Sequence, residues 1–303
     1  MTAKKDGYLG NPNLKPVGVQ QQFTQEQVQE YVKCANDPIY FVEKYVKIVA
    51  VDKGLVPFEM YDFQKELIQN LHSNRFVIGK LPRQVGKTTT VGAYLLHYVL
   101  FNQNMNVAIL ANKQSTAIEI LGRIKMAYEY LPKWLQQGVI EWNKGSIVLE
   151  NGSRILAAAT SSSAIRGGSF NCILLDEFAH IPTQIAEEFF TSVYPTITSG
   201  QSTKMFIIST PNGLNMFYYY WKGAINKQNG YVPFEVHWSQ VPKYPGGPLR
   251  DDKWKQDMIS KTSEKQFEQE FECVSGDTLV SVRDKITNKI HEIPISDLYE
   301  WLI

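Results

Sequence analysis

Residues 77–90 read VIGKLPRQVGKTTT, and this stretch sets the architecture that we expect of the whole chain. An apolar run leads into a short loop, then into Gly86, Lys87 and Thr88, and then into a helical pattern that continues to Phe101. Backbone N–H groups at the start of such a helix carry partial positive charge and favour phosphate. In this setting Gly86 permits close backbone approach, Lys87 reaches the β- and γ-phosphates, and the Thr88 hydroxyl binds Mg²⁺. The stretch therefore predicts a nucleotide-binding phosphate loop.

One position departs from the usual pattern, because Leu81 stands where the first glycine of a phosphate loop is expected. Gly-Lys-Thr alone also occurs by chance, so the prediction depends on a second motif, CILLDE at 172–177. An apolar run there ends in two carboxylates, at the sheet edge where open α/β sheets bind ligands. We expect Asp176 to hold Mg²⁺ and Glu177 to orient and polarise the attacking water. The alternative is a pair of solvated carboxylates at a strand end.

Short apolar runs alternate with helical patterns from residue 75 to residue 238. The runs are RFVIGK (75–80), NVAILA (106–111), CILLDE (172–177), KMFIIS (204–209) and PFEVHW (233–238). Continuous apolar character is typical of strands buried on both faces. We therefore expect an α/β fold with a mostly parallel central sheet. The run at 106–111 lies between the two motifs in sequence and suggests the additional-strand, RecA-like branch of P-loop ATPases.

Local signals mark further elements of this fold. Helix starts are predicted at three capping pairs, which are Thr24 with Gln27, Thr116 with Glu119, and Ser263 with Gln266. Residues 147–156 predict a hairpin that turns at Asn151-Gly152. Residues 1–23 are polar and rich in Gly, Pro and Asn, and we expect them to form a flexible arm.

Composition narrows the classes of function. Lys and Arg number 31 and Asp and Glu number 30, so the net charge of +1 gives no global signal for nucleic acid. The three cysteines, Cys34, Cys172 and Cys273, are too scattered for a metal cluster or a disulfide framework, and a reducing compartment is expected. We expect no signal peptide and no membrane span.

Two further polar positions could contact a nucleotide. Gln64, in MYDFQKELI, has donors and an acceptor that suit an adenine edge, although a surface glutamine on an amphipathic helix is the alternative. Ser209 and Thr210 end the run at 204–209, where their hydroxyls could sense the γ-phosphate. The alternative for these two is a plain turn built on Pro-Asn-Gly.

Phosphoryl transfer also requires a cation near the transferred group. Arg83, inside the loop, could act in cis. Arg166 lies ten residues before Asp176 and could act in trans on a neighbouring subunit, or could simply anchor a Ser/Gly loop. The sequence leaves both sources open.

Together, these residues resemble the ATPase half of the terminase large subunit, the DNA-packaging motor of tailed phages, over residues 24–272. LPRQVGKTTT is similar to that family's deviant phosphate loop, with Arg83 and Gln84 before the glycine. YDFQKELI resembles its adenine motif, and STPNG its coupling motif. The segments 107–121, 159–181 and 250–271 resemble the remaining parts of that ATPase. The nucleotide-binding residues that the resemblance implies are Gln64, Gln84, Gly86, Lys87, Thr88, Thr89 and Thr210.

The resemblance implies a Mg²⁺-dependent ATP hydrolase that acts on double-stranded DNA. Portal and small terminase subunit are its implied partners, in a homo-oligomeric ring. The implied location is the host cytoplasm, with transient residence at the procapsid portal vertex. In that family a metal-dependent nuclease domain follows the ATPase, and no residue of this chain is assigned to it.

Residues 273–303 open on a cysteine and read CVSGDTLVSVRDKITNKIHEIPISDLYEWLI. Alternating apolar residues predict a strand, a turn and a returning strand, followed by a short helix from Ser296. The segment resembles the start of an intein, whose fold is of the Hint type. There the thiol of Cys273 would act as a nucleophile on the carbonyl of Glu272.

The remaining intein blocks are absent, and 31 residues are too few to bury a core alone. We therefore expect the N-terminal piece of a split intein, whose partner piece is attached to the nuclease half of the motor. A truncated contiguous intein and an ordinary linker are the alternatives. For the ATPase region, a helicase-like nucleic-acid ATPase and a nucleotide-binding adaptor remain open.

Overall fold

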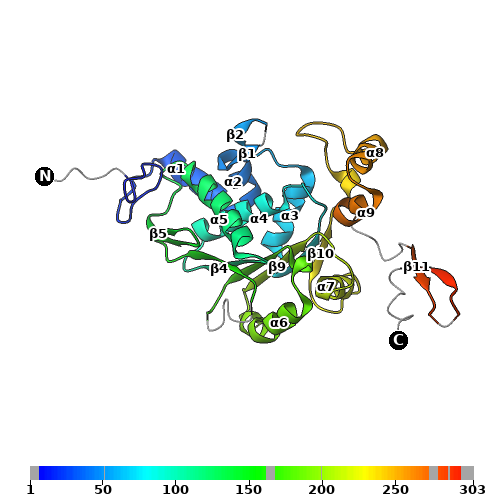
Figure 1. Ribbon diagram of the computed structural model, residues 1–303. Coiled ribbons are helices and arrows are strands. Elements are labelled where there is room, and N and C mark those ends of the chain that lie inside the picture. The colour runs from blue at the N-terminus through cyan, green and yellow to red at the C-terminus, as the bar shows by residue number, and fades with distance from the viewer. Residues whose placement is uncertain are drawn as a thin grey trace.

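The computed structural model describes residues 7–50, 52–161, 168–198, 200–272, 279–285 and 287–294. Its centre is an eight-stranded sheet with the order β10-β3-β9-β8-β4-β7-β6-β5 (Figure 1). The strands are β3 (Phe76–Lys80), β4 (Asn106–Ala111), β5 (Val139–Asn143), β6 (Ser146–Leu149), β7 (Arg154–Ala159), β8 (Cys172–Asp176), β9 (Lys204–Ser209) and β10 (Val232–Glu235). The helices are α1 (Gln25–Asn36), α2 (Pro38–Tyr45), α3 (Asp62–Ser73), α4 (Lys87–Phe101), α5 (Gln114–Glu129), α6 (Thr183–Thr198), α7 (Met216–Ile225), α8 (Asp252–Lys261) and α9 (Glu264–Phe267).

The six strands from β10 to β7 run parallel, and β6 and β5 extend the sheet in antiparallel fashion. The prediction of a mostly parallel α/β sheet is therefore confirmed. The strand that separates the phosphate-loop strand from the carboxylate strand is β9, which pairs with both β3 and β8. The strand β4, whose position in the sequence suggested the additional-strand branch, instead lies on the far side of β8.

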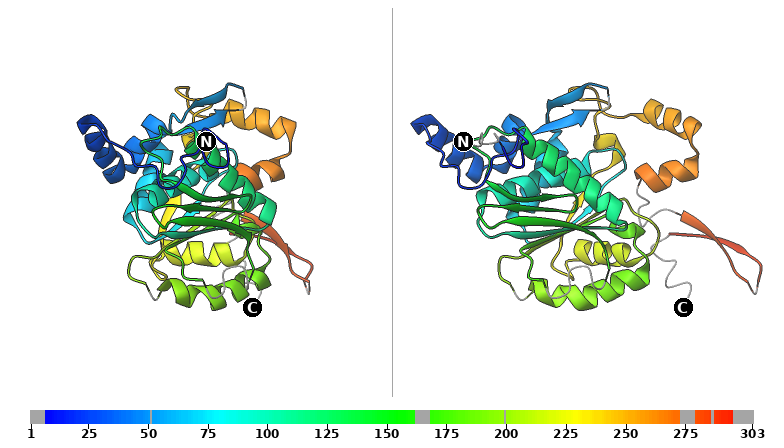
Figure 2. Two further views of the ribbon diagram at one scale, coloured as in Figure 1. Left: turned by 90° about the vertical axis from the view of Figure 1, so that its left-hand side faces the viewer. Right: turned by 60° about the vertical axis from the view of Figure 1, so that its left-hand side comes forward.

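Helices cover both faces of the sheet, α1 to α5 on one face and α6 and α7 on the other (Figures 1 and 2). Strand β4 shows why its sequence is apolar throughout. Val107 and Ile109 pack into one hydrophobic core, while Ala108 and Leu110 pack into the core on the opposite face. Continuous apolar runs are therefore the signature of a sheet sandwiched between helices.

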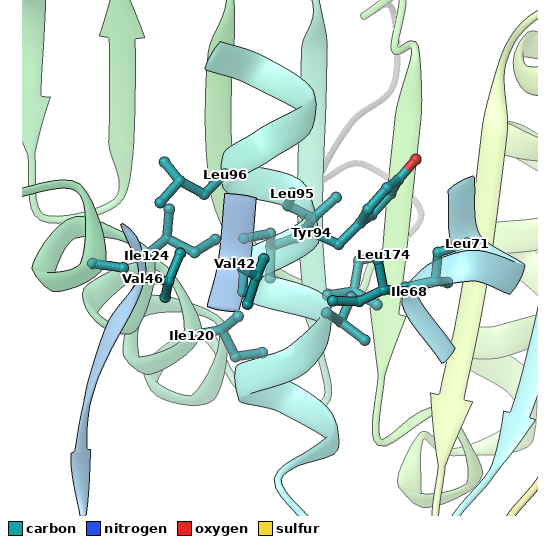
Figure 3. Packing of buried hydrophobic residues seen from close by; sticks show 14 of the residues in the cluster. Val42, Val46, Ile68, Leu71, Tyr94, Leu95, Leu96, Ile120, Ile124 and Leu174 are labelled. Atoms are coloured by element: carbon teal, nitrogen blue, oxygen red, sulfur yellow. The ribbon is translucent and has the colours of Figure 1, made fainter. Parts of the chain in front are cut away.

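Helix α4, which follows the phosphate loop, is the centre of the larger core (Figure 3). Tyr94, Leu95 and Leu96 are each at most 1% exposed and contact neighbours on both sides of the helix. Truncating such a leucine to alanine typically costs about 2–5 kcal/mol of stability. This packing fixes the first turn of α4, and with it the position of the phosphate loop.

The local predictions have mixed outcomes. The Thr24–Gln27 capping box is present at α1, and Ser263 caps α9 through the backbone N–H of Gln266. The hairpin at 147–156 is confirmed as β6 and β7, with Gly152 at φ +80° in the turn. The Thr116–Glu119 prediction is wrong. Helix α5 begins at Gln114, Lys113 is its N-cap, and no side chain caps it.

The expected N-terminal arm is not loose where the structure describes it. Leu14 is 1% exposed, and the carbonyl of Lys15 accepts a hydrogen bond from the N–H of Val139. The backbone N–H of Lys15 in turn donates to the Gln136 side chain. A single buried leucine and its backbone contacts are enough to order a segment whose composition is otherwise typical of a flexible arm.

Residues 238–272, here called the C-terminal helical segment, form a small cluster of their own. Trp238, Phe267 and Phe271 are buried, and the ring of Trp254 stacks on Trp238 with centroids 5.8 Å apart. The segment continues from α9 into a π-helical turn, η3 (Glu268–Glu272). Its apolar face is covered by its own aromatic rings.

Beyond this segment lies the predicted hairpin, β11 (Leu279–Arg283) paired antiparallel with β12 (Ile290–Pro294). Another two-stranded sheet joins β1 (Lys47–Ala50) to β2 (Gly54–Pro57). Cys273 and the helix expected from Ser296 lie outside the described residues. Among the described helices, none is long and apolar enough to cross a membrane.

The buried imidazole of His97 predicts an acid-sensitive fold. Its Nε2 lies 2.9 Å from the carbonyl of Cys34, so the neutral ring donates there, and burial lowers its pKa from 6.5 to about 4. The unfolded chain therefore binds a proton more readily between pH 6.5 and 4, and stability falls as the pH drops through this window. Between pH 7 and pH 5 we expect the protonation of His97 to lower the free energy of unfolding by about 2 kcal/mol.

Chemical denaturation at the two pH values tests this prediction. The His97→Gln variant retains an amide donor for Cys34 and should lose most of this pH dependence. A smaller pH dependence of stability should remain in this variant, because burial also lowers the pKa of His72. An unchanged pH dependence in His97→Gln would contradict the assignment.

Candidate active site

The phosphate loop connects β3 to α4 in a conformation that only a few residue types tolerate. Gly86 is the N-cap of α4 and has φ +73°, which favours glycine. Gln84 also has a positive φ, +58°. The loop is tied to the neighbouring strand because the N–H of Leu81 donates to the carbonyl of Ser209, at 3.1 Å. The missing first glycine therefore leaves the loop intact, with Leu81 buried in the core beside β9.

Gln64 lies beneath this loop and is 3% exposed, so the surface alternative considered for it is wrong. Its Nε2 donates to the carbonyl of Val85 at 3.0 Å, and its Oε1 accepts from the N–H of Tyr61 at 2.9 Å. The side chain thus joins the start of α3 to the phosphate loop. The predicted adenine contact stays a prediction, and the observed contacts give Gln64 a supporting role as well.

Lys87 and Glu177 form the central ion pair of the site, with Nζ 2.9 Å from Oε1. The lysine side chain is only 7% exposed. The second carboxylate oxygen of Glu177 accepts from the Thr210 hydroxyl at 3.2 Å, and Nε2 of His180 lies 3.0 Å from the same hydroxyl. Lys87 at the start of α4, Glu177 just after β8 and Thr210 just after β9 therefore meet at one point. The roles predicted for these three residues stay predictions.

Asp176 ends β8 and is 2% exposed. The Thr88 hydroxyl donates to its Oδ2 at 3.3 Å. Burial, and then the charge of Glu177, raise the pKa of Asp176 to about 6, against the opposing effects of Lys87 and Thr88. The two oxygens are hard donors of the kind that Mg²⁺ prefers together with substrate phosphates. They suit the predicted magnesium site, and bound Mg²⁺ would favour the ionised form of Asp176.

Glu177 differs from Asp176 in its backbone conformation and in the direction of its pKa shift. Its φ of +51° and ψ of +40° place it in the left-handed region, a strained conformation found at functional sites. Burial alone would raise its pKa, but the charge and hydrogen bond of Lys87, followed by His180 and Thr210, outweigh burial and lower it. Glu177 is therefore ionised at neutral pH, as a residue that polarises water must be.

The backbone after Glu177 is held by side chains that the sequence analysis did not single out for this purpose. The hydroxyl of Ser209 accepts from the N–H of Ala179 at 3.0 Å, and the amide of Asn215 donates to the carbonyl of Ala179 at 2.6 Å. Ser209 and Thr210 are both buried, and the hydroxyl of Ser209 holds the turn. The sensing of phosphate predicted for them stays a prediction. His180 and Asn215 carried no motif that could have marked them.

Of the two predicted arginines, Arg83 lies within the described residues. Arg83 is 60% exposed, and its Nη1 lies 2.7 Å from Oε1 of Glu270. Its backbone N–H also donates to the carbonyl of Glu270 at 2.8 Å. Arg166 lies outside the described residues. The sequence analysis missed a third arginine, Arg123 of α5, which donates to the Thr89 hydroxyl at 3.0 Å. The two residues are 34 positions apart, so no local motif marks this contact.

The geometry of a phosphate loop facing two carboxylates accords with a comparison of sequence families. A family model described as "Terminase large subunit, T4likevirus-type, N-terminal" matches residues 78–284, more than half of the chain. The chain belongs to this family. The match begins in β3 and runs through the C-terminal helical segment into β11, past the predicted junction between Glu272 and Cys273.

Solved structures show the same fold. The large terminase of bacteriophage HK97 superposes with a TM-score of 0.65 at 17% identity, over 81% of this chain and 56% of the HK97 chain. The large terminase ATPase domain of Thermus phage P74-26 gives 0.55 at 20% identity, over 71% and 94%. The large terminase of the thermophilic bacteriophage D6E, in complex with ATP-gamma-S, gives 0.51 at 10% identity, over 69% and 51%.

The coverage values also compare the length of this terminase-family chain with the lengths of the solved structures. It spans little more than half of the HK97 and D6E chains, and nearly all of the P74-26 ATPase domain. The α/β architecture predicted from the sequence is therefore that of the N-terminal ATPase domain of a phage terminase large subunit.

Two glycines with the same backbone conformation allow the support beneath the loop to be tested. Gly86 and Gly230 both have φ +73°, but a Cβ on Gly86 would lie 2.7 Å from Nε2 of Gln64, whereas a Cβ on Gly230 would meet nothing within 4 Å. Each change to alanine should cost about 1–2 kcal/mol from the left-handed backbone. Gly86→Ala should cost about 1 kcal/mol more, because Gln64 must leave the carbonyl of Val85.

The free energy of unfolding of Gly86→Ala and Gly230→Ala, measured in urea, decides this point. Equal losses in the two variants would mean that the contact between Gln64 and the loop contributes nothing to stability.

Proposed function

We propose that this terminase-family chain hydrolyses ATP. The residues that would bind the nucleotide and promote its hydrolysis are Lys87, Thr88, Asp176, Glu177 and Thr210. The observation that supports this most strongly is the meeting of Lys87, Glu177 and Thr210 at the ends of three adjacent parallel strands. In the proposed complex the β/γ-phosphates lie in the loop formed by residues 81–88, against its backbone N–H groups. The family relative from phage D6E, with its ATP-gamma-S, supports ATP as the nucleotide.

In the proposed reaction Lys87 leaves Glu177 and binds the phosphates, which replace the carboxylate as its counter-charge. Glu177, ionised and held by Thr210, then accepts a hydrogen bond from the attacking water and polarises it toward the γ-phosphorus. Bound Mg²⁺, held by Thr88 and Asp176, would supply charge neutralisation at the phosphate oxygens. Arg83 or Arg166 would neutralise further charge, in cis or in trans.

We further propose that hydrolysis drives double-stranded DNA into the procapsid. The family supports this proposal, as does the fold shared with the HK97 large terminase. The working assembly would be a homo-oligomeric ring that engages the portal and the small terminase subunit. It would form in the host cytoplasm and reside at the portal vertex during packaging. We propose that a separate chain supplies the nuclease half of the motor.

We propose that residues 273–303 supply that connection as the N-terminal fragment of a split intein. The sulfur of Cys273 would attack the carbonyl carbon of Glu272, the C–N bond would break, and the freed amine of Cys273 would take the proton, leaving a thioester. The antiparallel pairing of β11 with β12 is the hairpin that this assignment requires. The partner fragment would then add strands to it and complete the splice.

Glu177→Gln tests the hydrolytic role, because it keeps shape and hydrogen bonding but removes the charge. We expect steady-state ATP turnover to fall by about a hundredfold or more, with ATP affinity retained. Glu235→Gln is the matched control, since Glu235 also pairs with a lysine, Lys80, at the same end of the sheet, and its turnover should be unchanged. Undiminished turnover in Glu177→Gln would exclude the role assigned to Glu177, whereas absence of turnover in the wild type would favour a nucleotide-binding adaptor.

Mass spectrometry tests the splicing proposal. When this chain is mixed with candidate chains that carry an intein C-terminal fragment and a nuclease half, a ligated product should retain residues 1–272 and lose 273–303. Cys273→Ala should form none. Ligation by the alanine variant, or no ligation with any such partner, would remove the proposal.

A further inference from the structure

His180, Thr210 and Glu177 form a chain of hydrogen bonds whose direction is fixed by the chemistry of the three groups. Nε2 of His180 lies 3.0 Å from the Thr210 hydroxyl oxygen, and this hydroxyl lies 3.2 Å from Oε2 of Glu177. A hydroxyl group has one hydrogen to donate, and an ionised carboxylate can only accept. Thr210 therefore donates to Glu177, and its oxygen accepts a hydrogen bond from Nε2–H of His180. The chain runs from the imidazole through the hydroxyl to the carboxylate.

The backbone places His180 where it can make this contact. It is the last residue of η1 (Phe178–His180), the 3₁₀ turn that follows Glu177, and its N–H donates to the carbonyl of Glu177 at 2.9 Å. Phe178 and Ala179 are buried in the core on the face of the sheet that α6 and α7 cover. The side chain of His180 itself is 32% exposed. The core therefore holds the turn in place, while the imidazole lies at the margin of the site.

The two carboxylate oxygens of Glu177 have different partners. Oε1 pairs with Nζ of Lys87 at 2.9 Å, whereas Oε2 accepts from Thr210 and lies 3.6 Å from Nε2 of His180. In the proposed reaction Lys87 leaves the carboxylate for the phosphates. In the described part of the chain, Thr210 and His180 are then the polar side chains that still contact Glu177. Without the donor from His180, the Thr210 hydroxyl could rotate toward another acceptor, such as a phosphate oxygen.

We propose that His180 is a positioning residue, which directs the Thr210 hydroxyl toward Glu177 and so keeps the carboxylate in place after Lys87 has moved to the phosphates. The imidazole acts through Thr210 and makes no contact with the reacting atoms. Its contribution is preorganisation, since a base that polarises water must be held in a productive geometry. The inference rests on the proposed function, because it needs Glu177 to act on water.

Two amide variants of His180 test this role because they differ in reach. The side-chain nitrogen of glutamine can occupy the place of Nε2, whereas that of asparagine corresponds to Nδ1 and falls short of Thr210. For His180→Asn we expect kcat for MgATP to fall about tenfold, the effect of one hydrogen bond on a barrier. The Kd for magnesium ATP-gamma-S should stay within about twofold of the wild type. His180→Gln should recover most of kcat.

His237→Asn is the matched control. His237 lies just beyond the end of β10, is exposed, and contacts the Ser239 hydroxyl through its Nδ1. Its variant should therefore match the wild type in both kcat and Kd. Should His180→Asn unfold on thermal denaturation, His180→Leu, which also lacks the donor, takes its place.

A double-mutant cycle tests whether His180 acts through Thr210. Thr210→Val removes the hydroxyl and leaves His180 nothing to direct. In this background His180→Asn should lower kcat no further, because the two changes remove the same interaction.

Several results would overturn the inference and leave the proposed function intact. These are wild-type kcat in His180→Asn, equal losses of kcat in the two amide variants, and an undiminished effect of His180→Asn in the Thr210→Val background. A raised Kd in His180→Asn with unchanged kcat would also overturn it, because His180 would then bind the nucleotide directly. A wild-type protein without ATP turnover would instead refute the proposed function itself.

Discussion

The ion pair between Lys87 and Glu177 is the constraint on which the site depends. A lysine that is 7% exposed needs a counter-charge, because an unpaired buried ammonium group is strongly destabilising. Glu177 supplies it, and this pairing fixes the carboxylate against Thr210 in a strained, left-handed backbone. A triphosphate offers the lysine a stronger set of negative charges. In the proposed reaction, binding would therefore release Glu177 when a water-polarising base is needed, so the same contact would both order the site and prepare it for reaction.

The C-terminal helical segment is connected to the same loop at two points. Glu270 holds both the backbone N–H and the side chain of Arg83, and Arg250 contacts the carbonyl of Gln84. The segment packs chiefly through its own aromatic cluster, so it can be regarded as a unit that rests on the phosphate loop. Glu270 lies two residues before the proposed splice junction at Glu272. The turn η3 therefore contacts the predicted phosphate loop directly, through Glu270 and Arg83.

Sequence patterns predicted the parts of this structure that are encoded locally. Apolar runs predicted the buried strands, and the motifs around Lys87 and Asp176 predicted residues that lie together at the candidate site, because parallel strands bring their carboxyl ends to one edge. The sequence could not predict contacts made between distant segments, such as Arg83 with Glu270, Arg123 with Thr89, or the burial of Arg250. It also misplaced the start of α5, which begins at Gln114, before the capping pattern at Thr116. A buried leucine at position 14 likewise ordered a segment of loop-like composition.

The most direct test of the central claim is a crystal structure of the full chain with Mg²⁺ and a non-hydrolysable ATP analogue. We predict that the phosphates lie in the loop formed by residues 81–88, that Nζ of Lys87 has moved from Glu177 to a phosphate oxygen, and that the metal lies between Thr88 and Asp176. A nucleotide bound elsewhere, or a lysine still paired with Glu177 while the phosphates occupy the loop, would contradict the account.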